Sequence, residues 1–358
     1  MAIFALSFFL SLEIATRIDQ AFHYGAPLFG AYSYDSALFE YDEHGIRGRP
    51  GGVYEKWRLN ALGLRGPEAS LRPEGDRLRI VALGASETFG LYESPNSEWP
   101  RVLEQELSRQ GVYSEVLNGA IAGMSSAAQL RHLRHRLLPL SPDVVIWIVH
   151  YASFAGFDPA HLEALSDARI SPRDPPGLVA RLTPRTFRRL RDAIPPRLPE
   201  PVHERIESGW MRLKLTRARL RSGEAFGSMV RVSNNERATF EYFLARVKQE
   251  TEETGASLIV VLPPRRLDEP SLRTQYLAFP SVASSWLVDA LEIFSRSAAD
   301  ASTGGALSVV DLHQLFGSDV NEFMMDTVHF NDAGALAFAK AIAPSVVTAS
   351  FSDRASAR

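Results

Sequence analysis

Short apolar segments alternate with segments of helical spacing along most of the 358 residues of this chain. Strands that are apolar on both faces have to be covered on both sides, and a helix between successive strands supplies that cover. The alternation therefore predicts an α/β fold of three layers, in which a parallel sheet is flanked by helices. The predicted strands are 78–83, 113–117, 143–149, 257–262 and 307–312.

Five further segments are predicted helices from the spacing of their apolar residues. The segment 125–138 also carries terminal signals, because serine stands near its start and Pro139 follows its end. The other four are 99–110, 235–254, 286–299 and 331–347.

The composition limits the classes of function. A chain of 358 residues is long enough for one large domain or two modest ones. The net charge of −3 gives no reason to expect a nucleic-acid partner, and the absence of cysteine excludes disulfides, thiolate metal sites and thiol nucleophiles. His313 follows a strand without a ligand-spaced partner, so we expect neither a metal nor a cofactor.

Changes in composition divide the chain into parts. Residues 1–20 are a hydrophobic segment, and 21–75, rich in Gly, Tyr, Pro and charge, are an extended preface packed on the main domain. The main domain comprises 76–155 and 235–350. Between its two halves, 156–234 form an Arg- and Pro-rich helical insertion or cap.

The insertion is strongly basic. From Arg169 to Arg231 it holds 15 Lys and Arg against 6 Asp and Glu, a local charge of +9 in a chain of net charge −3. A solvated helical face accounts for such a run, and so does a site for an anionic surface or substrate, such as phospholipid headgroups or an acidic polysaccharide. It lacks the interleaved aromatic residues that stack on bases, so we expect no nucleic acid.

The first twelve residues are apolar, and Glu13 and Arg17 then interrupt the run. A full membrane span needs about 20 apolar residues, and a signal peptide begins with a basic region that is absent here. Three interpretations follow: a short signal anchor, a buried or interfacial helix, or a cleaved signal peptide. We expect membrane association on the extracytoplasmic side, with a cytoplasmic protein as the alternative.

One serine and one carboxylate–imidazole pair stand out. Ser86 follows the strand 78–83 at a glycine-bounded turn, and Asp326 precedes His329 by three residues. A serine acts as a nucleophile when a base takes its proton and a third group orients that base. Because loops at the carboxyl ends of parallel strands gather at one edge, we expect these residues to meet there.

Three blocks around these residues resemble those of the SGNH (GDSL-like) hydrolase family. They are Gly84 to Gly90, Asn118 to Ser125, and Asp326 to Gly334, and with the strand order the resemblance covers about 60–150 and 235–345. The segment Asn60 to Glu68 also resembles the preface of membrane-anchored members linked to exported polysaccharides.

The resemblance implies a fold and a set of roles. The fold would be the flavodoxin-like sheet of the SGNH hydrolases. Ser86 would be the nucleophile, with His329 as general base oriented by Asp326. The backbone N–H groups of Ser86 and Gly123 would stabilise the oxyanion.

The sequence departs from the family at the oxyanion hole. Where the family has an asparagine after the third strand, this chain has Ala152, which has no side-chain donor. Losing one such donor costs roughly 10²–10³ in rate. Candidate substitutes, or substrate-binding residues, are Asn118, His150, Tyr151 and Ser153; for Asn118 the alternative is a structural role in its turn, and for His150 it is packing in its loop.

These features favour a serine esterase that removes a small acyl group such as acetyl from a carbohydrate or polysaccharide. The expected partner is a small acyl ester or an acylated glycan. Two alternatives stand beside it: an O-acyltransferase that uses the same triad on an exported polysaccharide, and a non-catalytic binding or assembly protein that keeps the fold. The sequence contains no signal for the oligomeric state.

Overall fold

The computed structural model describes most of the chain. The described residues are 2–30, 32–170, 227–302 and 307–356, with 185–186, 205, 209, 212–217 and 220 in addition. Most of the predicted helical insertion therefore lies outside the described residues.

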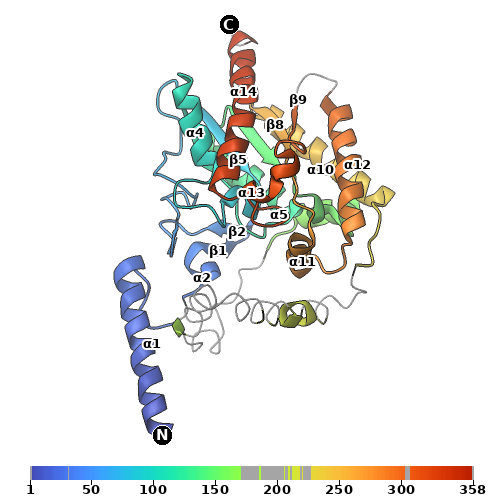
Figure 1. The fold of residues 1–358 in the computed structure, drawn as a ribbon. Coiled ribbons are helices and arrows are strands. Elements are labelled where there is room, and N and C mark those ends of the chain that lie inside the picture. The colour runs from blue at the N-terminus through green and yellow to red at the C-terminus, as the bar shows by residue number, and fades with distance from the viewer. Residues whose placement is uncertain are drawn as a thin grey trace.

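A five-stranded sheet forms the centre of the molecule (Figure 1). Its strand order is β6-β5-β7-β8-β9, and every neighbouring pair is parallel. The predicted α/β class is confirmed, and the five predicted strands are found to within one residue at each end. They are β5 (Leu78–Leu83), β6 (Ser114–Asn118), β7 (Val144–Ile148), β8 (Ser257–Leu262) and β9 (Leu307–Asp311).

Helices cover both faces of this sheet. One face packs on α4 (Trp99–Arg109) and α14 (Asp332–Ser356). The other packs on α5 (Ser126–His132), α10 (Asn234–Glu253) and α12 (Ser284–Ser302). Successive side chains of β5 enter the two layers in turn and all are buried, which explains why its sequence is continuously apolar.

The predicted helix 125–138 is wrong in its second half. The α-helix α5 ends at His132, and the chain continues as a π-helical turn over Leu133–Leu137 and a 3₁₀ turn over Leu138–Leu140. Pro139 has no N–H for the helical ladder, and its ring obstructs the preceding turn. The apolar spacing predicted a helix correctly but not the change in its winding.

The preface has more structure than the extended segment that was expected. It contains α2 (Tyr34–Leu38) and two short antiparallel pairs, and its apolar side chains pack on the loop that follows β6. The pairs are β1 (Phe39–Asp42) with β2 (Gly45–Gly48), and β3 (Val53–Tyr54) with β4 (Trp57–Arg58). The remaining elements are the short helix α3 (Ser86–Phe89), α6 (Pro159–Asp167), α11 (Glu269–Ala278), α13 (Val320–Phe323), and 3₁₀ turns at Tyr151–Phe154 and Gly317–Asp319.

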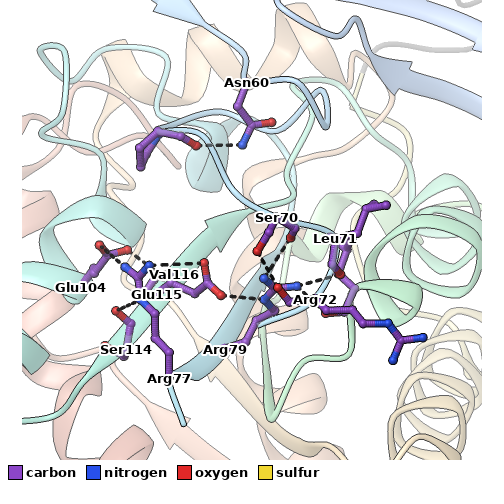
Figure 2. A network of polar contacts seen from close by, with 12 residues as sticks. Asn60, Ser70, Leu71, Arg72, Arg77, Arg79, Glu104, Ser114, Glu115 and Val116 are labelled. Atoms are coloured by element: carbon purple, nitrogen blue, oxygen red, sulfur yellow. Dashed lines mark hydrogen bonds and ion pairs between the residues drawn. The ribbon is translucent and has the colours of Figure 1, made fainter. Parts of the chain in front are cut away.

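A buried arginine fastens the end of the preface to the sheet (Figure 2). The fully buried Arg79 of β5 pairs with Glu115 of β6 at 2.8 Å. Its other N–H groups donate to the backbone carbonyls of Ser70, Leu71 and Leu140 at 2.7 to 3.0 Å. Because a buried guanidinium needs partners for its donors, the preface completes a network that the sheet cannot satisfy alone.

The first helix, α1 (Ala2–Tyr24), projects away from the rest of the molecule (Figure 1). Glu13 accepts hydrogen bonds from the backbone of Arg185 and Thr186, while the Arg185 side chain reaches Gln20 and the carbonyls of Pro27 and Gly30. Large apolar side chains of α1 are exposed, namely Phe4, Leu6, Phe8, Phe9, Leu10, Ile14, Ile18 and Phe22.

No helix among the described residues combines the length and the apolar character needed to cross a membrane.

The buried ion pair gives a stability prediction. Glu115→Gln keeps the shape of the side chain but leaves the guanidinium of Arg79 without its counter-charge, so we expect a loss of about 3 kcal/mol in the free energy of unfolding. Urea denaturation measures it. The control is Glu292→Gln, which removes the partner of Arg296 in an exposed ion pair on α12. It should leave the urea concentration at the midpoint of unfolding unchanged. Equal midpoints for the two variants would contradict a stabilising role for the buried network.

Candidate active site

Ser86 begins the short helix α3, three residues after β5 ends at Leu83, and Gly84 turns the chain between them. A Cβ on Gly84 would lie 2.1 Å from Oγ1 of Thr88, so only glycine allows α3 to fold back this closely on the turn. Gly90 ends the helix with a φ of 84°, a left-handed conformation that favours glycine. The glycine-bounded turn of the sequence thus serves to present Ser86 at the carboxyl end of β5.

The carbonyl groups at the end of α3 are held by two buried side chains. Arg65 of the preface donates to the carbonyls of Phe89 and Gly90, and also pairs with Glu98 at 3.2 Å. The amide of Asn118 donates to the carbonyl of Thr88 at 2.9 Å. These bonds satisfy carbonyls that a helix end leaves without partners, and so fix the helix that carries Ser86.

Asp326 and His329 lie in the long connection between β9 and α14. Both carboxylate oxygens of Asp326 are 2.8 Å from Nδ1 of His329, and Oδ1 also accepts the backbone N–H groups of Val328 and His329 at 3.0 Å. Burial by itself would raise the pKa of Asp326, but the hydrogen bonds from His329 and the backbone outweigh it and hold that pKa below its usual value. The ionised carboxylate of Asp326 holds the ring of His329 through Nδ1, so that Nε2 points away from the carboxylate.

Nε2 of His329 is buried and has no hydrogen-bond partner among the described residues. The ring of Tyr92 meets the imidazole edge-on at 5.2 Å between centroids. Ser86 and His329 line the same cavity, although no hydrogen bond joins them in this structure. Such bonds are often long in unliganded enzymes and tighten when substrate binds. The structure therefore brings together the serine, imidazole and carboxylate that the sequence singled out.

The cavity has a volume of about 450 Å³ and lies at the carboxyl edge of the sheet. Its wall is formed by the loops that follow β5, β6, β7 and β9, by the loop after β8, and by α11 and α12. The polar or catalytic-type side chains on it are Ser86, Ser125, His150, Tyr151, Ser153, Arg265, Gln275, Asp326, Thr327 and His329. No cluster of metal-ligating side chains occurs in the described part of the chain.

The predicted oxyanion positions are at the cavity. Gly123 lines it with a φ of 80°, and Ala152 lies on its wall. Of the candidate substitutes, Asn118 is not among the lining residues; it is buried and engaged with Thr88 and Ala120, which assigns it the structural alternative.

The three candidates beside Ala152 differ in whether their hydrogen-bond donors are already engaged. The hydroxyl of Tyr151 bonds to Nε2 of His313 at 2.5 Å, and that of Ser153 donates to the carbonyl of His150 at 2.6 Å. His150 lines the cavity beside Phe279, and burial lowers its pKa to about 4, so its ring is neutral at pH 7. A neutral imidazole has one N–H that can donate, so His150 stays a candidate for the missing donor.

Sequence reasoning missed two lining residues, Arg265 and Gln275. Arg265 stands three residues after β8, directly behind Pro263 and Pro264. Its position just after the end of a predicted parallel strand was a signal that could have identified it, because the residues that follow such strands gather at the site. Gln275 lies inside α11, a helix that the sequence analysis did not predict, and gave no such signal.

The chain is similar to several solved structures, at low sequence identity. No family model and no curated protein matches the chain. Similar solved structures include a lipase/acylhydrolase from Enterococcus faecalis (15% identity, TM-score 0.43, covering 75% of this chain and 95% of that one). Others are TesA (14%, 0.43, 76% and 99%) and an acetyl xylan esterase, AlAXEase (13%, 0.41, 75% and 100%).

Glu93, next to Tyr92, gives a pH prediction. Burial raises its pKa from 4.5 to about 7, although Arg65, His329 and the backbone N–H of Tyr92 oppose that rise. Between pH 4.5 and about 7 the unfolded chain loses this proton while the folded protein keeps it, so rising pH favours unfolding. Glu93→Gln removes this effect, so the free energy of unfolding of the variant should rise relative to that of wild type between pH 5 and pH 8, by about 2 to 3 kcal/mol in all.

Urea denaturation of both proteins at several pH values measures that difference. The comparison isolates Glu93 because every other titrating group is present in both. A stability difference that stays constant with pH would show that Glu93 titrates normally in the folded protein.

Proposed function

We propose that the protein is a serine esterase with Ser86 as nucleophile, His329 as general base and Asp326 as the group that orients it. The observation that carries this proposal is the buried, unpartnered Nε2 of His329, fixed through Nδ1 by Asp326 in the cavity that also contains Ser86. That is the arrangement a serine nucleophile requires.

The reaction proceeds in two halves. Oγ of Ser86 attacks the ester carbonyl while its proton passes to Nε2 of His329. The bond from carbon to the leaving oxygen then breaks, and the alcohol departs with that proton. Water, deprotonated by His329, next attacks the acyl-enzyme and releases the acid and Ser86. The N–H groups of Ser86 and Gly123 stabilise both oxyanions, with the neutral ring of His150 as the third donor in place of the missing asparagine.

The substrate we propose is a carbohydrate carrying a small acyl group. The support is the volume of the cavity, about 450 Å³, which lies within the range of small-molecule sites and accommodates an acyl group with a sugar ring. One of the similar solved structures, AlAXEase, is described as an acetyl xylan esterase.

The decisive experiment is covalent labelling. A fluorophosphonate should attach to the peptide that contains Ser86 and not to the peptide that contains Ser125, the matched control because it is a second serine on the same cavity wall. Ser86→Ala should abolish labelling and reduce p-nitrophenyl acetate hydrolysis by at least 10³-fold. No labelling of wild type, with equal turnover by the two proteins, would favour the non-catalytic alternative.

The same experiment extends to the transferase alternative. Added sugar would divert the acyl group from water in a transferase, giving acylated sugar at the expense of free acid. An esterase should release free acid at an unchanged rate. Chromatography of both products distinguishes the two.

We also propose that α1 attaches the protein to a membrane surface. Its support is the set of exposed apolar side chains on α1. Among them Phe4 and Phe22, 83% and 85% exposed, lie across the helix from Glu13 and Gln20, which contact Arg185. A helix with one polar and one apolar face lies in the interface of a bilayer.

Vesicle flotation tests this attachment. Phe4→Ser combined with Phe8→Ser should reduce the fraction of protein that floats with phosphatidylglycerol-containing vesicles at least fivefold, since each change removes apolar area from the bilayer. Phe29→Ser is the matched control, because Phe29 is 89% exposed but lies outside α1. An equal effect of both variants, or no flotation of wild type, would contradict the attachment through α1.

A further inference from the structure

Arg265 is a buried cation that has no counter-ion among the described residues. Its residue is only 8% exposed, and Nη2 donates to the carbonyl of Val149 at 2.7 Å. The guanidinium lies over the ring of Tyr151 at 5.0 Å. Nε and Nη1 have no hydrogen-bond partner, and no carboxylate in the described part of the chain forms an ion pair with it. Asp326 and the buried Glu87 attract the guanidinium only from beyond ion-pair distance.

This condition differs from that of Arg79 and Arg65, two buried arginines that hold the fold together. Arg131 also has no carboxylate partner among the described residues, but it does not line the cavity. Arg79 pairs with Glu115, and Arg65 pairs with Glu98. A buried charge with unused donors is costly, because the lost hydration is not replaced. Arg79 and Arg65 serve structure and are compensated from within the chain. Arg265 lines the cavity, and no carboxylate among the described residues balances its charge. A negatively charged group of a ligand could therefore do so.

Gln275 is a second uncompensated polar group on the same wall. It is 7% exposed, and neither its amide oxygen nor its amide nitrogen has a partner among the described residues. The amide and the guanidinium together provide donors from α11 and from the loop after β8. Much of the remaining wall is apolar, namely Ala85, Met124, Ala152, Ala155, Phe157, Ala278, Phe279 and Leu287.

We propose that Arg265 and Gln275 form a subsite for a carboxylate of the substrate, in the same cavity as Ser86 and His329. The inference rests on the proposed function and narrows its substrate class to anionic esters. A guanidinium matches the two oxygens of a carboxylate with parallel N–H donors, and the amide N–H of Gln275 adds a neutral donor. The carboxylate belongs either to the acyl group, as in the half-ester of a dicarboxylic acid, or to an acidic sugar that carries a neutral acyl group.

Paired esters test the subsite by kinetics. The first pair is p-nitrophenyl hemisuccinate and p-nitrophenyl butyrate, and the second is the acetylated methyl glycosides of glucuronic acid and glucose. Wild type should prefer the anionic member of one pair, which identifies the source of the carboxylate. Arg265→Gln should reduce kcat/KM for that member about 10- to 100-fold and for its neutral partner less than threefold. Arg265→Lys should recover part of the preference because it restores the charge.

The matched control is Arg273→Gln on α11, which removes an exposed arginine outside the cavity wall. It should leave the preference unchanged. Equal losses for both members of each pair in Arg265→Gln, or no preference in wild type, would overturn the subsite. If Arg265→Gln fails to fold, Gln275→Glu replaces it: an added carboxylate of the same size should weaken the anionic ester about tenfold more than the neutral one.

Equilibrium binding separates this inference from the proposed function. Calorimetric titration of Ser86→Ala with monomethyl succinate and dimethyl succinate, and with the methyl glycosides of glucuronic acid and glucose, involves no turnover. A preference for the anionic member that Gln275→Glu abolishes supports the subsite even if wild type hydrolyses no ester, in which case only the esterase proposal fails. Hydrolysis by wild type with equal binding of both members in each pair leaves the esterase and removes the subsite.

Discussion

Burial of a parallel sheet on both faces is the constraint on which the rest of this structure depends. With α4 and α14 on one side and α5, α10 and α12 on the other, the strands can present residues to a ligand only at their ends. The carboxyl edge collects Ser86 after β5, Gly123 after β6 and His329 after β9. Residues as far apart in the sequence as Ser86 and His329 therefore line one cavity, because all five strands run in the same direction.

The preface is part of this arrangement rather than a linker to it. Arg79 depends on preface carbonyls for two of its hydrogen bonds, and Arg65 extends from the preface to the end of α3. Both are buried cations whose charge is met by a carboxylate, Glu115 or Glu98. The helix that carries Ser86 is a single turn and has little stability of its own. Its position therefore depends on contacts from other elements: Arg65 of the preface provides the charged one and Asn118 of β6 the neutral one.

Electrostatics divide the cavity into two parts. Near Ser86 lie Asp326, whose pKa is held low, the ring of His329, whose Nε2 has no partner among the described residues, and His150, whose pKa is lowered by burial. On the wall formed by Arg265 and Gln275 several donors have no partner in the described part of the chain, and this is the part of the cavity that we propose binds a carboxylate. Ala152 offers no side-chain donor to the first part, and Arg265 gives the second part a feature that the resemblance noted in the sequence does not imply.

The sequence by itself determined the layers, the strands and the serine, carboxylate and imidazole, because each of these depends on local pattern: continuous apolar runs, a glycine-bounded turn, and two residues three apart. It did not reveal that α5 changes its winding before Pro139, since apolar spacing is similar in the two kinds of helix. Only the tertiary structure decided the role of Asn118, which depends on a carbonyl thirty residues away, and the state of Arg265. Whether a buried charge has a partner is a property of space, and no local pattern along the chain records it.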